Sequence, residues 1–156
     1  MCGAHAAVRS LVKEMVDQYD RPTVVDMEAG LEHLSRGTTR NVDCLLAVIE
    51  PYFKSMETGA RVCELAKELG IQKVFGVANK VRHAEDEKAL HEFCERRHVE
   101  LLGFIPYDEA LLEAERAGVA PLDYDRTSLA VLAIADLAQK MTNSNSLPLE
   151  VDAVVD

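Results

Sequence analysis

Asp26 and Gly30 are an acidic residue and a glycine that could act together on a phosphate group. Asp26 follows the apolar run 23–25, and a carboxylate at the mouth of a buried strand can reach a Mg²⁺ ion through water. A glycine four residues later lets backbone N–H groups approach a phosphate oxygen. The spacing is common and aspartate is frequent at strand ends, so this pair needs support from further motifs.

Two later segments offer groups that suit a flat ring. Asn79 and Lys80 follow the apolar run 74–78, and an asparagine side chain offers both a donor and an acceptor, as the edge of a purine base requires. Pro106 and Tyr107 follow the run 101–105, where a rigid proline and an aromatic ring could wall a planar ligand. Each segment taken alone is more often an ordinary strand-to-helix turn.

Cysteines could supply thiolates to a metal ion, but the four present have no Cys-x-x-Cys spacing. Cys44, Cys63 and Cys94 lie in apolar or helical patterns, where a small buried hydrophobic residue is the expected role. Cys2 differs because it stands at the start of the chain beside Gly-Ala-His. We expect all four to be reduced, since the first residues do not have the pattern of an export signal.

Hydrophobic periodicity predicts the elements that must position these residues. We expect strands at 23–27, 44–49, 74–78 and 101–105, and helices at 4–19, 54–69, 84–97, 108–117 and 128–141. Asp108 is expected to cap the fourth helix, and Gly70 and Gly118 to end the second and fourth. Residues 28–41 are expected to form a long loop, and 142–156 a flexible tail after a single domain at 1–141.

Alternation of short apolar strands with helices predicts an α/β fold, a parallel sheet flanked by helices. In such sheets ligands bind beyond the carboxyl ends of the strands. The positions to consider are therefore those just after Val25, Ile49, Ala78 and Ile105.

Charge and hydropathy exclude several classes of partner. The formal net charge is −10 and no Lys/Arg cluster is present, which argues against nucleic acid and anionic membranes. No apolar run approaches the roughly 18 residues needed to cross a bilayer. We therefore expect a cytoplasmic protein.

The order of the motifs is more specific than any one of them. Asp-x-x-Ala-Gly, a strand ending in Glu-Pro, then Asn-Lys and Ile-Pro-Tyr-Asp resemble the nucleotide-binding ATPases of the nitrogenase iron protein and division-site-selection type. Within that class, VDMEAGLEHLSRGTTR at 25–40 and MCGAHAAVRSLV at the N-terminus resemble the nickel-insertion accessory ATPase of carbon monoxide dehydrogenase. The resemblance runs from Met1 to about Met141.

The resemblance implies an ATP-driven homodimer that delivers nickel to carbon monoxide dehydrogenase or a related metalloenzyme. Asp26 would lie in the Mg²⁺ second shell and Gly30 would sense the γ-phosphate, while Asn79, Pro106 and Tyr107 would border the adenine. The loop 28–40 would report hydrolysis to the dimer interface. Cys2 would bind the transported metal, nickel or zinc, between two subunits.

The sequence departs from that family in two places. No Gly-x-x-x-x-Gly-Lys-Ser/Thr pattern occurs, so the backbone cradle and lysine that neutralise the phosphates are missing. The expectation is thus a C-terminal portion, an incomplete P-loop NTPase-like three-layer fold without its phosphate-loop strand and without ATPase activity by itself. Of the family's two cysteines separated by one residue, only Cys2 is present, although His5 could add a ligand.

Two other interpretations fit parts of the pattern. A non-catalytic α/β interaction module would keep a partner-binding surface and bind no nucleotide, in keeping with the missing loop. A small flavodoxin-like or receiver-like domain would explain the alternation of elements but not the motif order. Glu32, His33 and the charged helix 84–97 receive no functional assignment.

Overall fold

The computed structural model describes residues 23–27 and 42–143. Its centre is a parallel sheet of three strands in the order β1-β2-β3. The strands are β1 (Cys44–Ile49), β2 (Lys73–Val81) and β3 (Leu101–Pro106). The helices are α3 (Phe53–Glu68), α4 (Ala84–Arg96), α5 (Glu109–Ala117), α6 (Pro121–Tyr124) and α7 (Leu129–Asn143).

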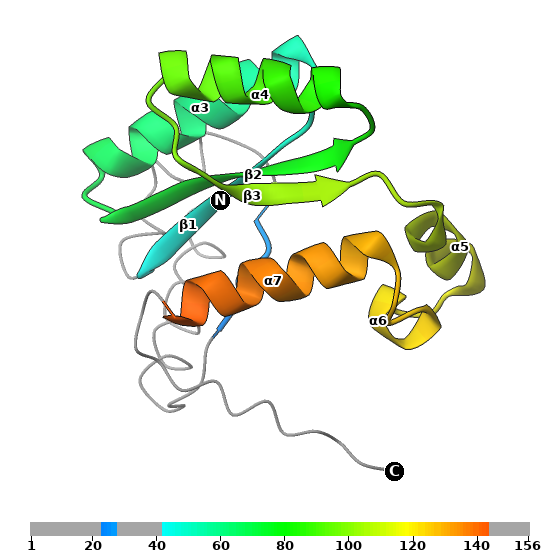
Figure 1. Cartoon of the computed structure of the whole chain (residues 1–156). Coiled ribbons are helices and arrows are strands. Elements are labelled where there is room, and N and C mark those ends of the chain that lie inside the picture. The colour runs from blue at the N-terminus through cyan, green and yellow to red at the C-terminus, as the bar shows by residue number, and fades with distance from the viewer. Residues whose placement is uncertain (1–22, 28–41, 144–156) are drawn as a thin grey trace, which may run out of the picture.

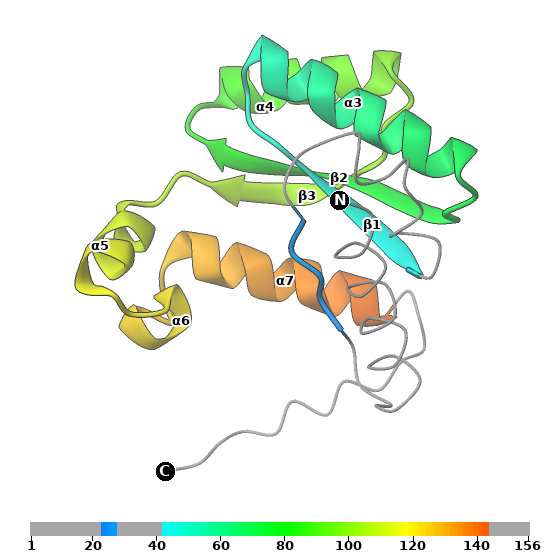
Figure 2. The same ribbon diagram turned by 180° about the vertical axis from the view of Figure 1, so that it is seen from behind.

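Helices cover both faces of the sheet. Helices α3 and α4 lie side by side on one face, and α7 lies on the other, mainly against β3 (Figures 1 and 2). The short helices α5 and α6 lie beyond the carboxyl end of β3 (Figure 1). This arrangement confirms the predicted α/β fold with helix-flanked parallel strands.

The main core fills the space between the sheet and the helices α3 and α4. Alternate residues of β1, Ala47 and Ile49, point into it, and Ile49 and Leu90 of α4 are fully buried. Gly59 of α3 lies so close to β1 that a Cβ atom there would stand 2.5 Å from Cγ1 of Ile49. The helix therefore approaches the strand more closely than any larger residue would allow.

The other face of β1 is open. Leu46 and Val48 are 39% and 60% exposed, because they point to the α7 side of the sheet, where α7 packs on β3. At Gly103 of β3 a Cβ would meet Leu137 of α7 at 2.8 Å. Among the described residues, β1 pairs with β2 alone.

Most predicted boundaries are confirmed to within two residues, but β2 runs to Val81 and not to Ala78, so Asn79 and Lys80 lie within the strand and not after it. Strand β1 matches its prediction at both ends, and α5 begins after Asp108 and ends at Gly118, which has the left-handed φ of 67°. Gly70, just after α3, also has a positive φ, 89°. Helix α6 had no counterpart in the sequence prediction.

The prediction of a buried strand at 23–27 is wrong. These residues form no strand, and Val24 is 94% exposed. A strand needs a neighbour whose N–H and C=O groups face its own, and the described residues supply none here. The predicted helix at 4–19, the predicted loop 28–41 and the tail from 144 lie outside the described residues.

Candidate functional site

The carboxyl ends of the three strands meet at one edge of the sheet. Glu50 follows β1, Asn79 and Lys80 lie near the end of β2, and Pro106 and Tyr107 close β3. Because the strands are parallel, these residues from three distant parts of the chain gather at the same edge. We refer to this set of five residues as the carboxyl edge.

A β-bulge shapes the end of β2. Ala78 pairs with Phe104 and Val81 with Pro106, so Asn79 and Lys80 together oppose the single residue Ile105. Lys80 has a φ of 56°, in the left-handed region that residues other than glycine rarely adopt. Bulges of this kind turn side chains away from the regular pleat and are common beside functional sites.

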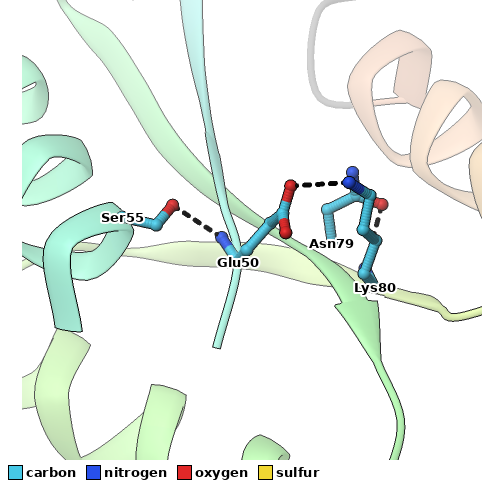
Figure 3. A network of polar contacts seen from close by, with 4 residues as sticks. All are labelled: Glu50, Ser55, Asn79 and Lys80. Atoms are coloured by element: carbon cyan, nitrogen blue, oxygen red, sulfur yellow. Dashed lines mark hydrogen bonds and ion pairs between the residues drawn. The ribbon is translucent and has the colours of Figure 1, made fainter. Parts of the chain in front are cut away.

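Hydrogen bonds join β1 to this bulge (Figure 3). Lys80 Nζ lies 2.9 Å from Glu50 Oε1 in an ion pair, and the Glu50 backbone N–H donates to Ser55 Oγ at 2.9 Å. The Lys80 backbone N–H donates to Asn79 Oδ1 at 3.0 Å. The hydrogen bond from Lys80 to Glu50 and the carboxylate charge raise the pKa of the Lys80 ammonium above its usual value.

Tyr107 is fixed from both its backbone and its ring. Its N–H donates to the Val81 carbonyl at 2.8 Å, which continues the pairing of β2 with β3 by one residue. The Arg82 guanidinium lies 3.5 Å from the centroid of the Tyr107 ring, a cation–π contact. One face of the aromatic ring is thus covered by an exposed arginine.

Asp108 holds two helices at this edge. Its Oδ1 accepts the Ala110 N–H at 3.0 Å, the N-cap of α5, and its Oδ2 accepts the Ala130 N–H at 3.1 Å, in the first turn of α7. These backbone hydrogen bonds, the one from Ala130 first, lower the pKa of Asp108 below its usual value of 3.8. The charged carboxylate is therefore the form that the fold favours.

The structure brings together some of the predicted site residues. Asn79, Pro106 and Tyr107 converge at the carboxyl edge. Asp26 is exposed in the segment 23–27, and among the described residues no hydrogen bond or ion pair joins it to that edge. Gly30 and Cys2 lie outside the described residues, so their roles stay predictions.

Sequence reasoning assigned no role to Glu50 or Arg82, which the structure places at the site. The Glu-Pro that ends β1 was recognised as part of the motif order, but its partner Lys80 is 30 residues away. The alternation of strands indicated that both ends share an edge. It gave no sign of the bulge that turns Lys80 towards Glu50.

The described residues hold no cluster of three or more His, Cys, Asp or Glu side chains that could bind a metal ion. Cys63 and Cys94 are free and buried, as predicted, whereas Cys44 is only partly buried. Burial raises the pKa of the Cys63 thiol to about 11. Within 23–27 and 42–143, no helix is both long and apolar enough to cross a membrane.

Curated proteins of known sequence resemble this chain over most of its length. An uncharacterized ATP-binding protein of Methanocaldococcus jannaschii, MJ0823, is 38% identical over 125 residues, 80% of this chain and 48% of that protein. The carbon monoxide dehydrogenase accessory protein CooC of Rhodospirillum rubrum is 37% identical over 123 residues, 79% of this chain and 46% of that protein. The chain thus spans about half the length of these relatives. No family model matches the sequence.

Solved structures agree on the fold. The cell division ATPase MinD of Pyrococcus furiosus superimposes with a TM-score of 0.74 at 21% identity, covering 90% of this chain and 59% of that one. MinD of Pyrococcus horikoshii, solved with Mg-ADP, gives 0.74 at 19% identity over 93% of this chain and 60% of that one. The chain therefore resembles CooC/MinD-type P-loop ATPases over part of their length.

Proposed function

We propose that this chain carries the base-binding part of an ATP-dependent accessory protein that inserts nickel into carbon monoxide dehydrogenase. The observation that supports this most directly is Asn79, placed by a bulge beside Pro106 and Tyr107 at the carboxyl edge. A half-buried asparagine at the same sheet edge as a tyrosine and a proline suits the polar rim and flat faces of adenine. The 37% identity to the carbon monoxide dehydrogenase accessory protein CooC supports carbon monoxide dehydrogenase as the target enzyme.

The remaining site residues have roles in the same proposal. Asp26 lies in the second shell of Mg²⁺, and Gly30 contacts the γ-phosphate. Cys2 binds Ni²⁺ or Zn²⁺ between two copies of the chain, because a single thiolate per subunit needs a second copy to build a site. The active form is then a cytoplasmic homodimer.

Nucleotide binding without hydrolysis is the expected behaviour of this polypeptide. The sequence has no Gly-x-x-x-x-Gly-Lys-Ser/Thr pattern, so the groups that usually stabilise the transferred phosphoryl group are missing. Base recognition depends on the carboxyl edge alone. Affinity for ATP should therefore be modest and should depend on the adenine more than on the phosphates.

Equilibrium binding of ATP and adenosine to the purified chain tests the base site. Asn79→Ala should weaken binding of both about tenfold, since a paired polar contact is lost. Gln72→Ala is the matched control, because Gln72 is an exposed amide whose hydrogen bond is to the Gly70 carbonyl, away from the carboxyl edge. Equal affinity of Asn79→Ala and the unmodified chain would overturn the base-binding role.

A separate titration tests the metal. Ni²⁺ or Zn²⁺ should bind at about one ion per dimer, and Cys2→Ser should abolish that binding, with Cys44→Ser as the control. Metal binding that survives Cys2→Ser would contradict the proposed site while leaving the nucleotide result intact.

The second function considered is a non-catalytic interaction module. Exposed apolar side chains favour it: Val48, Phe53 and Leu129 are 60%, 70% and 68% exposed. A chain that binds neither adenosine nor metal but forms a stoichiometric complex with carbon monoxide dehydrogenase would support this function instead.

A further inference from the structure

We infer that Glu50 and Lys80 are positioning residues that fix the orientation of Asn79, a role that rests on the proposed function of the carboxyl edge. Lys80 reaches back from β2 to the end of β1, and its backbone N–H holds the Asn79 carboxamide. Neither residue needs to touch the ligand for this role.

The backbone of Lys80 is in an unfavourable conformation. A left-handed φ of 56° brings its Cβ towards the neighbouring carbonyl, so a lysine persists there only if surrounding contacts compensate. The ion pair with Glu50 at 2.9 Å is such a contact (Figure 3). It runs between adjacent strands, from one carboxyl end to the next.

Glu50 is itself anchored. Its backbone N–H donates to Ser55 Oγ at 2.9 Å, in the first turn of α3, and its side chain is only 30% exposed. The backbone that carries this carboxylate is therefore held, and Lys80, whose side chain is 55% exposed, pairs with a residue that is better ordered than itself. A lysine paired with a fixed acidic partner has fewer accessible conformations than an ordinary surface lysine.

The backbone N–H of Lys80 donates to Asn79 Oδ1, 3.0 Å away. A flipped carboxamide would place its N–H₂ group against this N–H and lose the hydrogen bond, so the observed orientation, with N–H₂ donors and one lone pair left for other partners, is favoured. A ligand that meets Asn79 thus finds a donor and an acceptor in one preset order. Preorganisation of this kind raises affinity by removing the entropic cost of ordering the side chain on binding.

Two substitutions at one position separate this role from a direct contact. Lys80→Ala removes the ion pair and keeps the unfavourable left-handed backbone, whereas Lys80→Gly removes the ion pair and the steric conflict together. If Lys80 only positions Asn79, the alanine variant should bind ATP about five- to tenfold more weakly and the glycine variant should recover most of that loss. Glu50→Ala should behave like Lys80→Ala.

Lys88→Ala is the matched control. Lys88 is an exposed lysine on α4 that lies 3.8 Å from Glu92, so the same side-chain atoms and a looser ion pair are removed away from the carboxyl edge. Its ATP affinity should equal that of the unmodified chain.

A ligand-free measurement keeps the inference independent of the nucleotide. In ¹⁵N NMR spectra the Asn79 side-chain N–H₂ group should give dispersed, rigid resonances in the unmodified chain and in Lys88→Ala. In Lys80→Ala and Glu50→Ala the Asn79 side chain should become mobile. In Lys80→Gly its N–H₂ resonances should lie closer to those of the unmodified chain.

Either of two results would overturn the inference. Unchanged Asn79 resonances in Lys80→Ala and Glu50→Ala would show that the ion pair does not position the side chain. Equal loss of ATP affinity in Lys80→Gly and Lys80→Ala would show that the lysine charge acts on the ligand itself. If the unmodified chain binds no ATP, the proposed function fails, and the resonances still decide whether Asn79 is positioned.

Discussion

Asp108 and Ala130 lie 22 residues apart in the chain and are joined by a hydrogen bond of 3.1 Å from the Ala130 N–H to Asp108 Oδ2. The other carboxylate oxygen, Oδ1, caps α5 through the Ala110 N–H. One side chain thus satisfies backbone donors at the starts of two helices, groups that have no partner within a helix.

Loss of the Asp108 carboxylate should lower the free energy of unfolding by about as much as two helix caps contribute. Asp108→Ala is expected to lower the free energy of unfolding by about 2 kcal/mol, and Asp108→Asn, which keeps one acceptor oxygen, by about 1 kcal/mol. Urea denaturation followed by circular dichroism measures both. Asp123→Ala, an exposed acidic residue of α6, is the control and should change stability by less than about 0.5 kcal/mol. Equal stability of the alanine variant and the unmodified chain would contradict the double cap.

The Asp108 carboxylate should also make the free energy of unfolding depend on pH in the acid range. The pKa of Asp108 is lowered in the folded chain, because Ala130 and Ala110 donate to the charged form. Its contribution is therefore complete above the unfolded value and is lost as the pH falls through the lower, folded value. Unfolding measured from about pH 6 down to about pH 2 should show the difference between the unmodified chain and Asp108→Asn shrinking towards acid. A constant difference would contradict the assignment.

Gly59 should not tolerate a methyl group. A Cβ there would stand 2.5 Å from Cγ1 and 2.7 Å from Cδ1 of Ile49, which is fully buried and has no space to move into. Gly59→Ala should cost about 1–2 kcal/mol after its gain in helix propensity, whereas Thr58→Ala, exposed on the same helix, should be nearly neutral. In an Ile49→Ala background the Gly59→Ala change should become neutral or stabilising; a cost that persists there would rule out the clash.

Cys63 should resist alkylation in the folded chain. Burial raises the pKa of its thiol to about 11, so the reactive thiolate is scarce near neutral pH. Site-resolved mass spectrometry after iodoacetamide treatment should show Cys63 unmodified at about pH 8 and modified in urea, with the partly buried Cys44 reacting before Cys63. Because the folded pKa lies above the unfolded one, the neutral thiol stabilises the fold below about pH 9, and that contribution fades as the pH rises towards 11. Similar labelling rates with and without urea would contradict this burial.

Features with a local cause were predictable from the sequence. The apolar run of β1 predicted its bounds, and Asp108 and Gly118 marked the ends of α5 because capping and a left-handed φ each depend on one residue type. Parallel strands then placed Asn79 and Tyr107 at one edge.

Features that depend on distant partners were not predictable in this way. The run 23–25 has the composition of a strand, but strand formation needs a paired neighbour, and the described segment forms none. The bulge at Asn79 and Lys80 follows from how β2 and β3 align, since lysine does not favour the left-handed backbone that Lys80 adopts. The Glu50–Lys80 ion pair depends on that bulge.

Asp108 directly follows Tyr107, so the carboxyl edge and the start of α7 are linked through one carboxylate, which accepts the Ala130 N–H. A ligand that shifts the Tyr107 backbone is expected to disturb that hydrogen bond. Hydrogen exchange at Ala130, which requires this bond to open, would then report occupancy of the base site. The first turn of α7 is in this sense a readout built into the fold.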